Sequence, residues 1–82
     1  MDIITRVTIC LNTVDRVKRF CDAAEKFNSE VDAIMGRYII DAKSALGVYA
    51  LDLRKPIDVE IHSDDEEEIK RFNMVMEEFK IG

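Results

Sequence analysis

Apolar and polar residues alternate along four stretches of the chain, which is the pattern of β-strands with one buried face. These stretches are residues 3–11, 30–35, 38–43 and 57–62. In the first of them, the expected buried positions are Thr5, Val7, Ile9 and Leu11. Gly36 and Arg37 separate the second stretch from the third, and a glycine at the first position of a two-residue loop favours a type II′ turn. The sequence therefore predicts a β-hairpin over residues 30–43.

The two-residue loop also predicts the register of this hairpin. On the face away from the core, Ile34 is expected opposite Ile39, and Asp32 opposite Asp41. The other expected pairs are Met35 with Tyr38, Ala33 with Ile40, and Glu30 with Lys43. Two facing aspartates repel each other unless a cation, a proton or a neighbouring base compensates.

Apolar residues recur at spacings of three and four in two longer stretches, as they do on the buried face of a helix. The first helix is expected to follow a cap at Asn12 or Thr13, with apolar positions at Val14, Val17, Phe20, Cys21, Ala24 and Phe27. The last is expected to follow a capping box of Ser63 and Glu66, with inward positions at Ile69, Phe72, Val75, Met76 and Phe79. Between them the alternation stops at Ser44, a natural N-cap for a short apolar helix.

The expected order is strand, helix, strand, strand, short helix, strand, helix. Strands and helices that alternate in this way over 82 residues predict an α+β fold. We expect a four-stranded antiparallel sheet covered by helices on one face, an open-faced sandwich that forms a single domain over residues 1–82. The uncovered face of the sheet should be mainly acidic.

The composition and the absence of certain segments add three points to this picture. Seventeen acidic residues against twelve basic ones give a net charge of −5, which argues against nucleic acid as a partner. No stretch has the form of a signal peptide or the length of a membrane span, so we expect a cytoplasmic protein. Two cysteines do not form a disulfide framework, and we expect free thiols, with Cys21 in the core and Cys10 on the other face of its strand.

Candidate chemistry is sparse. A compact basic cluster of Arg16, Lys18 and Arg19 on the first helix is either a docking patch or a solvated face. The acidic run 64–68 suits the dipole at the start of a helix better than it suits metal ligation. His62 is expected to be an exposed structural histidine whose protonated form is favoured by nearby carboxylates. No catalytic, cofactor or metal site is predicted.

The segment Ala42-Lys43-Ser44-Ala45-Leu46-Gly47-Val48-Tyr49-Ala50-Leu51, together with the order of elements, resembles HPr, the histidine-containing phosphocarrier of the bacterial sugar phosphotransferase system. Residues 24–27 and the acidic start of the last helix extend the resemblance to nearly the whole chain. It implies an HPr-like fold and a regulatory serine at Ser44 that an ATP-dependent kinase phosphorylates. It also implies a partner surface at Leu46, Gly47, Val48 and Tyr49.

The carrier site of that family does not match. Between the first strand and the first helix the family has a histidine followed by an arginine, whereas this chain reads Leu11-Asn12-Thr13-Val14-Asp15-Arg16. Neither Thr13 nor Val14 can carry a labile phosphoryl group. Arg16 approximates the family's arginine, but Asp15 beside it would oppose phosphate. This degenerate segment predicts that histidine phosphotransfer is absent.

The leading hypothesis is an HPr-like regulatory or adaptor protein, related to the phosphotransferase system and phosphorylated on Ser44. The alternative is a phosphate-independent interaction module that uses the same fold. An enzyme or a metal protein is a third reading with no supporting constellation of residues. The expected partners are proteins, such as HPr kinase or components of the phosphotransferase system, rather than nucleic acid or membrane. The chain is expected to be a monomer or a weak homodimer.

Overall fold

The computed structural model of the protein describes residues 4–80. Its elements are β1 (Arg6–Ile9), α1 (Val14–Glu25), β2 (Glu30–Met35), β3 (Tyr38–Asp41), α2 (Ala45–Tyr49), β4 (Ile57–His62) and α3 (Glu66–Lys80). They follow in the predicted order. Within residues 4–80, no helix is long and apolar enough to cross a membrane.

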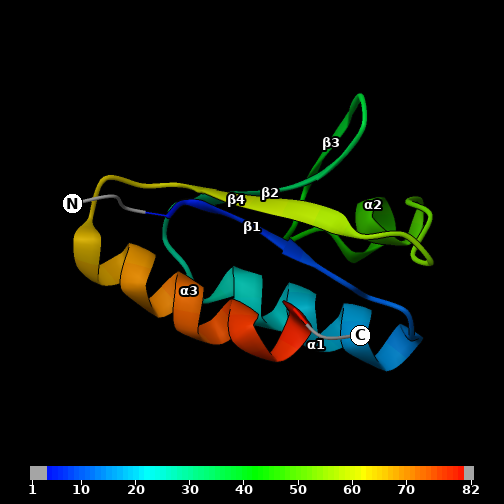
Figure 1. The fold of residues 1–82 in the computed structure, drawn as a ribbon, viewed down its shortest axis with the longest axis horizontal. Helices are drawn as coiled ribbons and strands as arrows, with labels where there is room; N and C mark the ends of the chain where they lie inside the picture. The colour runs from blue at the N-terminus through cyan, green and yellow to red at the C-terminus, as the bar shows by residue number, and fades with distance from the viewer. Residues whose placement is uncertain (1–3, 81–82) are drawn as a thin grey trace.

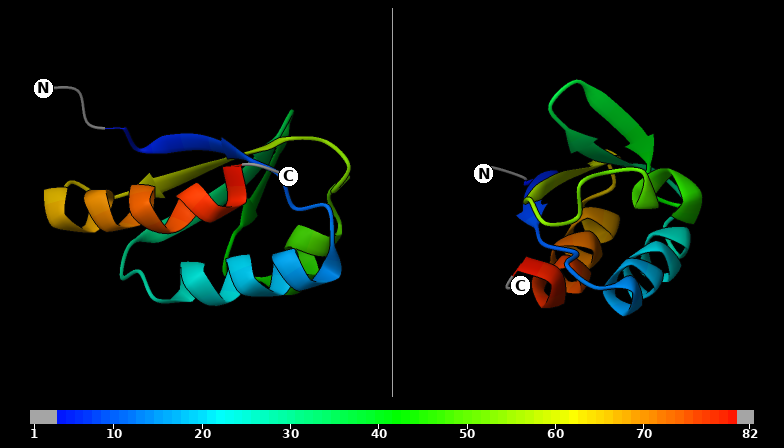
Figure 2. Two further views of the ribbon diagram at one scale, coloured as in Figure 1. Left: turned by 60° about the horizontal axis from the view of Figure 1, so that its bottom comes forward. Right: turned by 90° about the vertical axis from the view of Figure 1, so that its right-hand side faces the viewer.

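The four strands form one antiparallel sheet in the order β1-β4-β2-β3. The long helices α1 and α3 lie side by side against one face of this sheet, and the opposite face carries no helix (Figure 1). The short helix α2 packs beside α1 and against β3, at the margin of the helical layer (Figure 2). The predicted α+β open-faced sandwich is confirmed.

The β2–β3 hairpin has the predicted register over four pairs, from Met35 with Tyr38 to Asp32 with Asp41. Gly36 has a φ of +59°, and no non-glycine residue in the described range 4–80 has a positive φ, which fits a type II′ turn and excludes type I′. The expected pair of Glu30 with Lys43 is wrong, because β3 ends at Asp41. There the Asp41 carboxylate accepts a hydrogen bond from the Lys43 backbone N–H, which turns the chain out of the sheet.

The core lies between the sheet and the helical layer. Two aromatic pairs span α1 and α3: Phe20 meets Phe79 at 5.7 Å between ring centroids, and Phe27 meets Phe72 at 5.9 Å. Edge-to-face pairs of this kind add about 0.5–1.5 kcal/mol to the burial of the rings themselves. The predicted buried face of the first helix is confirmed except for Val14, which is 67% exposed because the first turn of α1 extends beyond the sheet.

Cys21 is buried and Cys10 is half-buried, and both are free thiols.

Two predicted boundaries are wrong. The first strand was expected over residues 3–11; Ile3 lies outside the described residues, and β1 covers only Arg6–Ile9. It ends there because the Cys10 N–H donates to the carbonyl of Phe79 in α3 instead of to another strand. The last helix begins at Glu66, not directly after Ser63. Asp65 takes over as its cap and accepts from the Glu67 N–H, so the expected capping box does not form.

Candidate functional site

Ser44 lies at the start of α2, where the strand conformation of β3 gives way to helix. Its backbone is extended, with φ −98° and ψ 105°, and its side-chain oxygen accepts a hydrogen bond from the Gly47 N–H at 3.3 Å. The residue is exposed. The predicted N-cap is therefore confirmed, and its hydroxyl is open to solvent.

The side chains of the two charged residues next to Ser44, Asp41 and Lys43, form hydrogen bonds with backbone groups other than those of Ser44. The Asp41 carbonyl accepts from the Ser44 N–H at 3.0 Å, while the Asp41 carboxylate accepts from the Lys43 N–H at 2.9 Å. Lys43 extends its ammonium to the Phe27 carbonyl at 2.8 Å, just beyond the end of α1. The lysine that precedes the serine thus ties α1 to the hairpin.

The expected partner surface on α2 is only partly exposed. Leu46 is 86% exposed and Tyr49 is 41% exposed, but Val48 is fully buried. Val48 follows Leu46 by two residues, which turns it through about 200° to the opposite face of the helix. Its expected place in a partner surface is therefore wrong, and Leu46 and Tyr49 provide the exposed side chains.

Gly47 is half-buried and packs closely against the hairpin. A Cβ atom at this position would come within 2.5 Å of Ile40 Cγ2 on β3. The glycine lets the backbone of α2 approach the hairpin closely, which keeps Ser44 and Leu46 at the margin of the sheet.

The segment before α1 contains the expected cap. Thr13 is extended, and its hydroxyl accepts from the Arg16 N–H at 3.2 Å. Thr13 and Val14 are both exposed. Position 13 is therefore confirmed as a structural cap, and the segment places a threonine and a valine at the surface.

Arg16 does not join Lys18 and Arg19 in a solvated cluster. Its guanidinium donates to the Cys10 carbonyl at 2.9 Å and to the Phe79 carbonyl at 3.1 Å, and it lies over the Phe79 ring. Arg19 forms an ion pair with Glu78 of α3. The expected basic cluster is thus divided, because two of its three members bind to the end of α3.

Glu68 was missed by the sequence reasoning. It is 6% exposed, and its carboxylate accepts from the N–H groups of Asn28 and Ser29 and from the Ser29 hydroxyl. Hydrogen bonds from the Ser29 and Ser63 hydroxyls, then from the two backbone N–H groups, lower the pKa of Glu68 to about 2. A signal was present, since Glu68 precedes Phe72 by four residues and so belongs to the buried stripe of α3.

His62 reduces the predicted repulsion between the facing residues Asp32 and Asp41 of the hairpin. Its Nε2 lies 2.6 Å from the Asp32 carboxylate, so the histidine compensates one of the two facing aspartates. The hydrogen bond to Asp32 raises the pKa of His62, and the charges of Asp32, Glu60 and Glu30 act in the same direction. The expected preference for the protonated form is confirmed, although its main source is Asp32 on β2.

The β1-β4-β2-β3 sheet backed by α1 and α3, with a serine-capped short helix at its margin, defines an HPr-like protein. A family model of the PTS-HPr family, described as the PTS HPr component phosphorylation site, matches residues 16–80. The chain therefore belongs to the HPr family and is related to the phosphotransferase system. The match begins at Arg16, so Thr13 and Val14 lie outside the matched residues.

Solved structures support the same fold. A crystal structure of HPr-C-His from Thermoanaerobacter tengcongensis superposes with a TM-score of 0.71 at 23% sequence identity, covering 92% of each chain. No match was found among curated proteins. Members of the HPr family are phosphocarriers rather than enzymes, and they work by contact with other proteins of the phosphotransferase system.

Proposed function

We propose that this protein is a regulatory or adaptor member of the HPr family, acting in the cytoplasm, that does not carry phosphate on a histidine. The observation that carries the proposal is the start of α1, where Thr13 and Val14 occupy the surface. Neither side chain can hold a phosphoryl group for transfer in the way an imidazole does.

His62 is poorly placed to substitute for the missing imidazole. The pair of Ile9 with Ile57 brings the start of β4 close to the end of β1, from which the chain leads into α1. His62 is at the other end of β4, about 16 Å along the strand, and its ring is hydrogen-bonded to Asp32. This separation supports a structural role for the only histidine of the chain.

We further propose that Ser44 is the regulatory residue and that HPr kinase is a partner. The exposed hydroxyl of Ser44 supports this, because a phosphate there would add about −1.5 to −2 charges at the head of α2, next to the Gly47 N–H. Leu46 and Tyr49 are the exposed apolar residues of the same helix. A change of charge beside them would change which protein docks on α2.

Intact-mass spectrometry after two separate incubations tests this function. With HPr kinase and ATP we expect one phosphate, which is lost in Ser44→Ala and retained in the matched control Ser63→Ala. With phosphoenolpyruvate and the phosphotransferase enzyme that charges HPr we expect none. Phosphate from phosphoenolpyruvate would overturn the claim about the carrier site, and an unmodified Ser44 after the kinase reaction would overturn the regulatory claim.

A phosphate-independent interaction module is the second candidate, and the charges beside Ser44 favour it. The Lys43 ammonium donates to the Phe27 carbonyl, so it is engaged away from Ser44. The Asp41 carbonyl accepts from the Ser44 N–H, which places an acidic residue beside the cap, where it would oppose a phosphate. If Ser44 is only a cap, Ser44→Ala lowers the free energy of unfolding by about 0.5–2 kcal/mol and leaves partner binding intact. Binding of a phosphotransferase-system protein to the kinase-treated and untreated forms separates the two candidates.

A further inference from the structure

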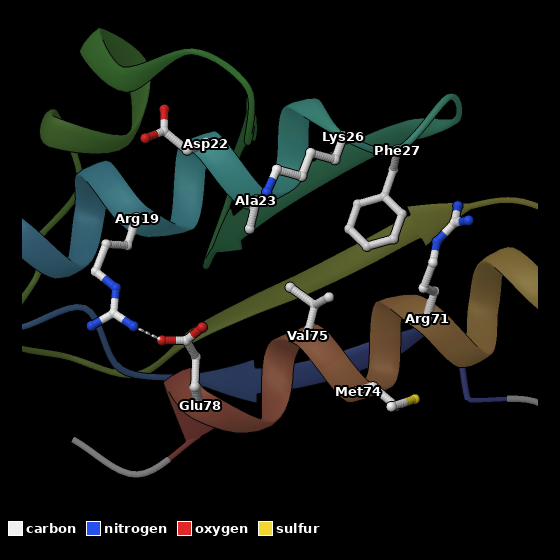
Figure 3. Close-up of a pocket in the computed structure, with 9 residues that line it drawn as sticks. All are labelled: Arg19, Asp22, Ala23, Lys26, Phe27, Arg71, Met74, Val75 and Glu78. Atoms are coloured by element: carbon white, nitrogen blue, oxygen red, sulfur yellow. Dashed lines mark hydrogen bonds and ion pairs between the residues drawn. The ribbon is translucent and has the colours of Figure 1, made fainter.

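A surface groove runs between α1 and α3 (Figure 3). It lies on the side of α1 that faces α3, whereas α2 lies on the other side of α1 (Figure 3). It has a volume of about 450 Å³. The residues that line it are Arg19, Asp22, Ala23, Lys26, Phe27, Arg71, Met74, Val75 and Glu78. None of these residues belongs to α2 or to the segment before α1, so the groove is a surface distinct from the one proposed above.

The walls of the groove have the spacing of two helix ridges. α1 and its C-cap Lys26 contribute positions 19, 22, 23 and 26, and α3 contributes 71, 74, 75 and 78, each an i, i+3, i+4, i+7 series. Seven residues of helix extend about 10 Å, or two turns. The ion pair of Arg19 with Glu78 and the packing of Phe27 on Phe72 show that the two helices run antiparallel along this length.

The floor of the groove is apolar. Val75 points toward the Phe27 ring, and Ala23 lies beside them on α1 (Figure 3). Met74, on the rim, is 76% exposed, although it is a large apolar residue. A flexible thioether at the rim and a small alanine in the floor allow another apolar side chain to approach closely and be covered.

The charges of the groove are unequal at its two ends. Arg19 and Glu78 neutralise each other at one end, and the Asp22 carboxylate points away from the floor (Figure 3). Arg71 lies over the face of Phe27 at 5.6 Å, and Lys26 lies on the facing wall. Within residues 4–80, neither Lys26 nor Arg71 forms an ion pair with a carboxylate. This end therefore carries two cations without a carboxylate partner among the described residues, in a chain of net charge −5.

We propose that the α1–α3 groove docks an amphipathic helix of a partner protein, with its apolar face on Ala23 and Val75 and its acidic residues beside Lys26 and Arg71. Two antiparallel helices offer a third helix a continuous groove, and about two turns of contact fit apolar anchors spaced at i, i+4 and i+7. Charge complementarity sets the direction of the docked helix. Acidic side chains can reach Lys26 and Arg71 only if they lie at the end of the docked helix that is next to Phe27.

The experiment uses a fluorescent helical peptide of about 14 residues with leucines at i, i+4 and i+7 and glutamates at one end. Its twin carries lysines in place of the glutamates, and a third peptide has the acidic sequence scrambled so that no apolar face forms. Binding is measured by anisotropy with the full chain, and the contacted residues are located by amide chemical shifts. We expect the acidic helix to bind at least tenfold more tightly than either of the other peptides, with shifts confined to the groove.

Matched variants locate the charge effect. Lys26→Gln with Arg71→Gln should weaken the acidic peptide at least tenfold, whereas Lys18→Gln with Lys70→Gln, the same change of net charge on the same two helices, should not. Lys26→Gln alone keeps the packing of Arg71 on Phe27 and should still weaken binding several-fold if the double variant fails to fold. Ser44→Ala should bind as the unmodified chain does, which separates this proposal from the function of α2.

Three outcomes would overturn the proposal. Equal binding of the lysine twin would show that the two cations do not select the ligand, and equal binding of the scrambled peptide would indicate recognition of an extended acidic chain. A concentration-dependent sedimentation coefficient of the free protein, with the same amide shifts, would assign the groove to a second copy of the chain.

Discussion

At the scale of single residues, two buried or half-buried charges hold the turns of the molecule in place. Glu68 gathers the N–H groups of Asn28 and Ser29 where α1 has ended and β2 is about to begin. Arg16 gathers the carbonyls of Cys10 and Phe79, which closes the chain after β1 onto the last turn of α3. Each side chain provides hydrogen-bond partners for part-buried backbone groups that lie between elements or in the last turn of a helix.

Replacing Glu68 tests this role. Glu68→Gln keeps the shape but removes the charge that accepts the hydrogen bonds from Asn28, Ser29 and Ser63, and we expect it to lower the free energy of unfolding by about 1.5–3 kcal/mol. Urea unfolding monitored by circular dichroism measures the change. Glu67→Gln, the exposed neighbour, is the control and should change the free energy of unfolding by less than about 0.5 kcal/mol.

The same group has a signature in acid. Its pKa is lowered in the folded protein, so its contribution is fully present above the ordinary value of 4.5 and is lost as the pH falls through about 2. The stability of the unmodified protein should therefore fall more steeply in this range than that of Glu68→Gln. Parallel curves for the two proteins would contradict the assignment.

The residues that cap helices could be predicted from the sequence, whereas these two charges could not. Ser44 and Thr13 bond to N–H groups three residues along the chain, and such local bonds leave a sequence signal. Arg16 bonds to a carbonyl 63 residues away, and Glu68 to an amide 40 residues away. Their partners are set by how the helices pack on the sheet, so periodicity alone placed Arg16 on the outer face of the first helix, as part of either a docking patch or a solvated face.

At the scale of elements, the interiors of strands and helices were predictable and several of their ends were not. Alternation and the Gly36 turn determine which residues face each other across the hairpin, because a slip of one residue would expose its buried side. The ends of β3 and α3 depend on competition between neighbouring polar groups. Asp41 accepts from the Lys43 N–H where β3 ends, and Asp65 accepts from the Glu67 N–H where α3 begins, so these local bonds move both ends away from the expected positions.

The packing of α2 on the hairpin gives a prediction at this scale. Alanine favours helix over glycine by about 1 kcal/mol, so on propensity alone Gly47→Ala should stabilise α2. The new methyl group would meet Ile40 Cγ2 at 2.5 Å, however, and this atom is attached directly to a branch point that cannot move far. We expect a net loss of about 1–3 kcal/mol in the free energy of unfolding, measured by urea unfolding.

A double-mutant cycle checks the cause. Ile40→Ala removes Cγ2, so Gly47→Ala should be much less destabilising in that background than in the unmodified protein. Ala45→Gly, in the same short helix, serves as the control for propensity and should be additive with Ile40→Ala. Additivity of Gly47→Ala with Ile40→Ala would refute the contact.

At the scale of the whole molecule, the sheet separates two different surfaces. The uncovered face carries a row across all four strands that runs Arg6, Glu60, Asp32 and Asp41 in the observed register. Glu30 and Asp58 lie on the same face, which is mainly acidic as the sequence predicts. Both proposed docking surfaces lie elsewhere, on α2 and between α1 and α3, so the acidic face need not be covered for either partner to bind.

His62 links this acidic face to pH. Its pKa in the folded protein is raised above the ordinary value of 6.5 by the hydrogen bond to Asp32, with Glu60 and Glu30 adding to the effect. The folded state therefore holds the proton more tightly than the unfolded state does. The stabilisation that follows is fully present below pH 6.5 and is lost as the pH rises through the raised pKa.

The free energy of unfolding should therefore decrease as the pH rises above about 6.5 and through the raised pKa of His62. His62→Asn removes the titrating group and should flatten this dependence, and Asp32→Asn, which removes the main cause of the shift, should flatten it most of the way. Urea unfolding at several pH values measures all three proteins. If His62→Asn kept the slope of the unmodified protein, the pH dependence would belong to another group, and the Asp32–His62 pair would contribute nothing to the balance of charge on the open face.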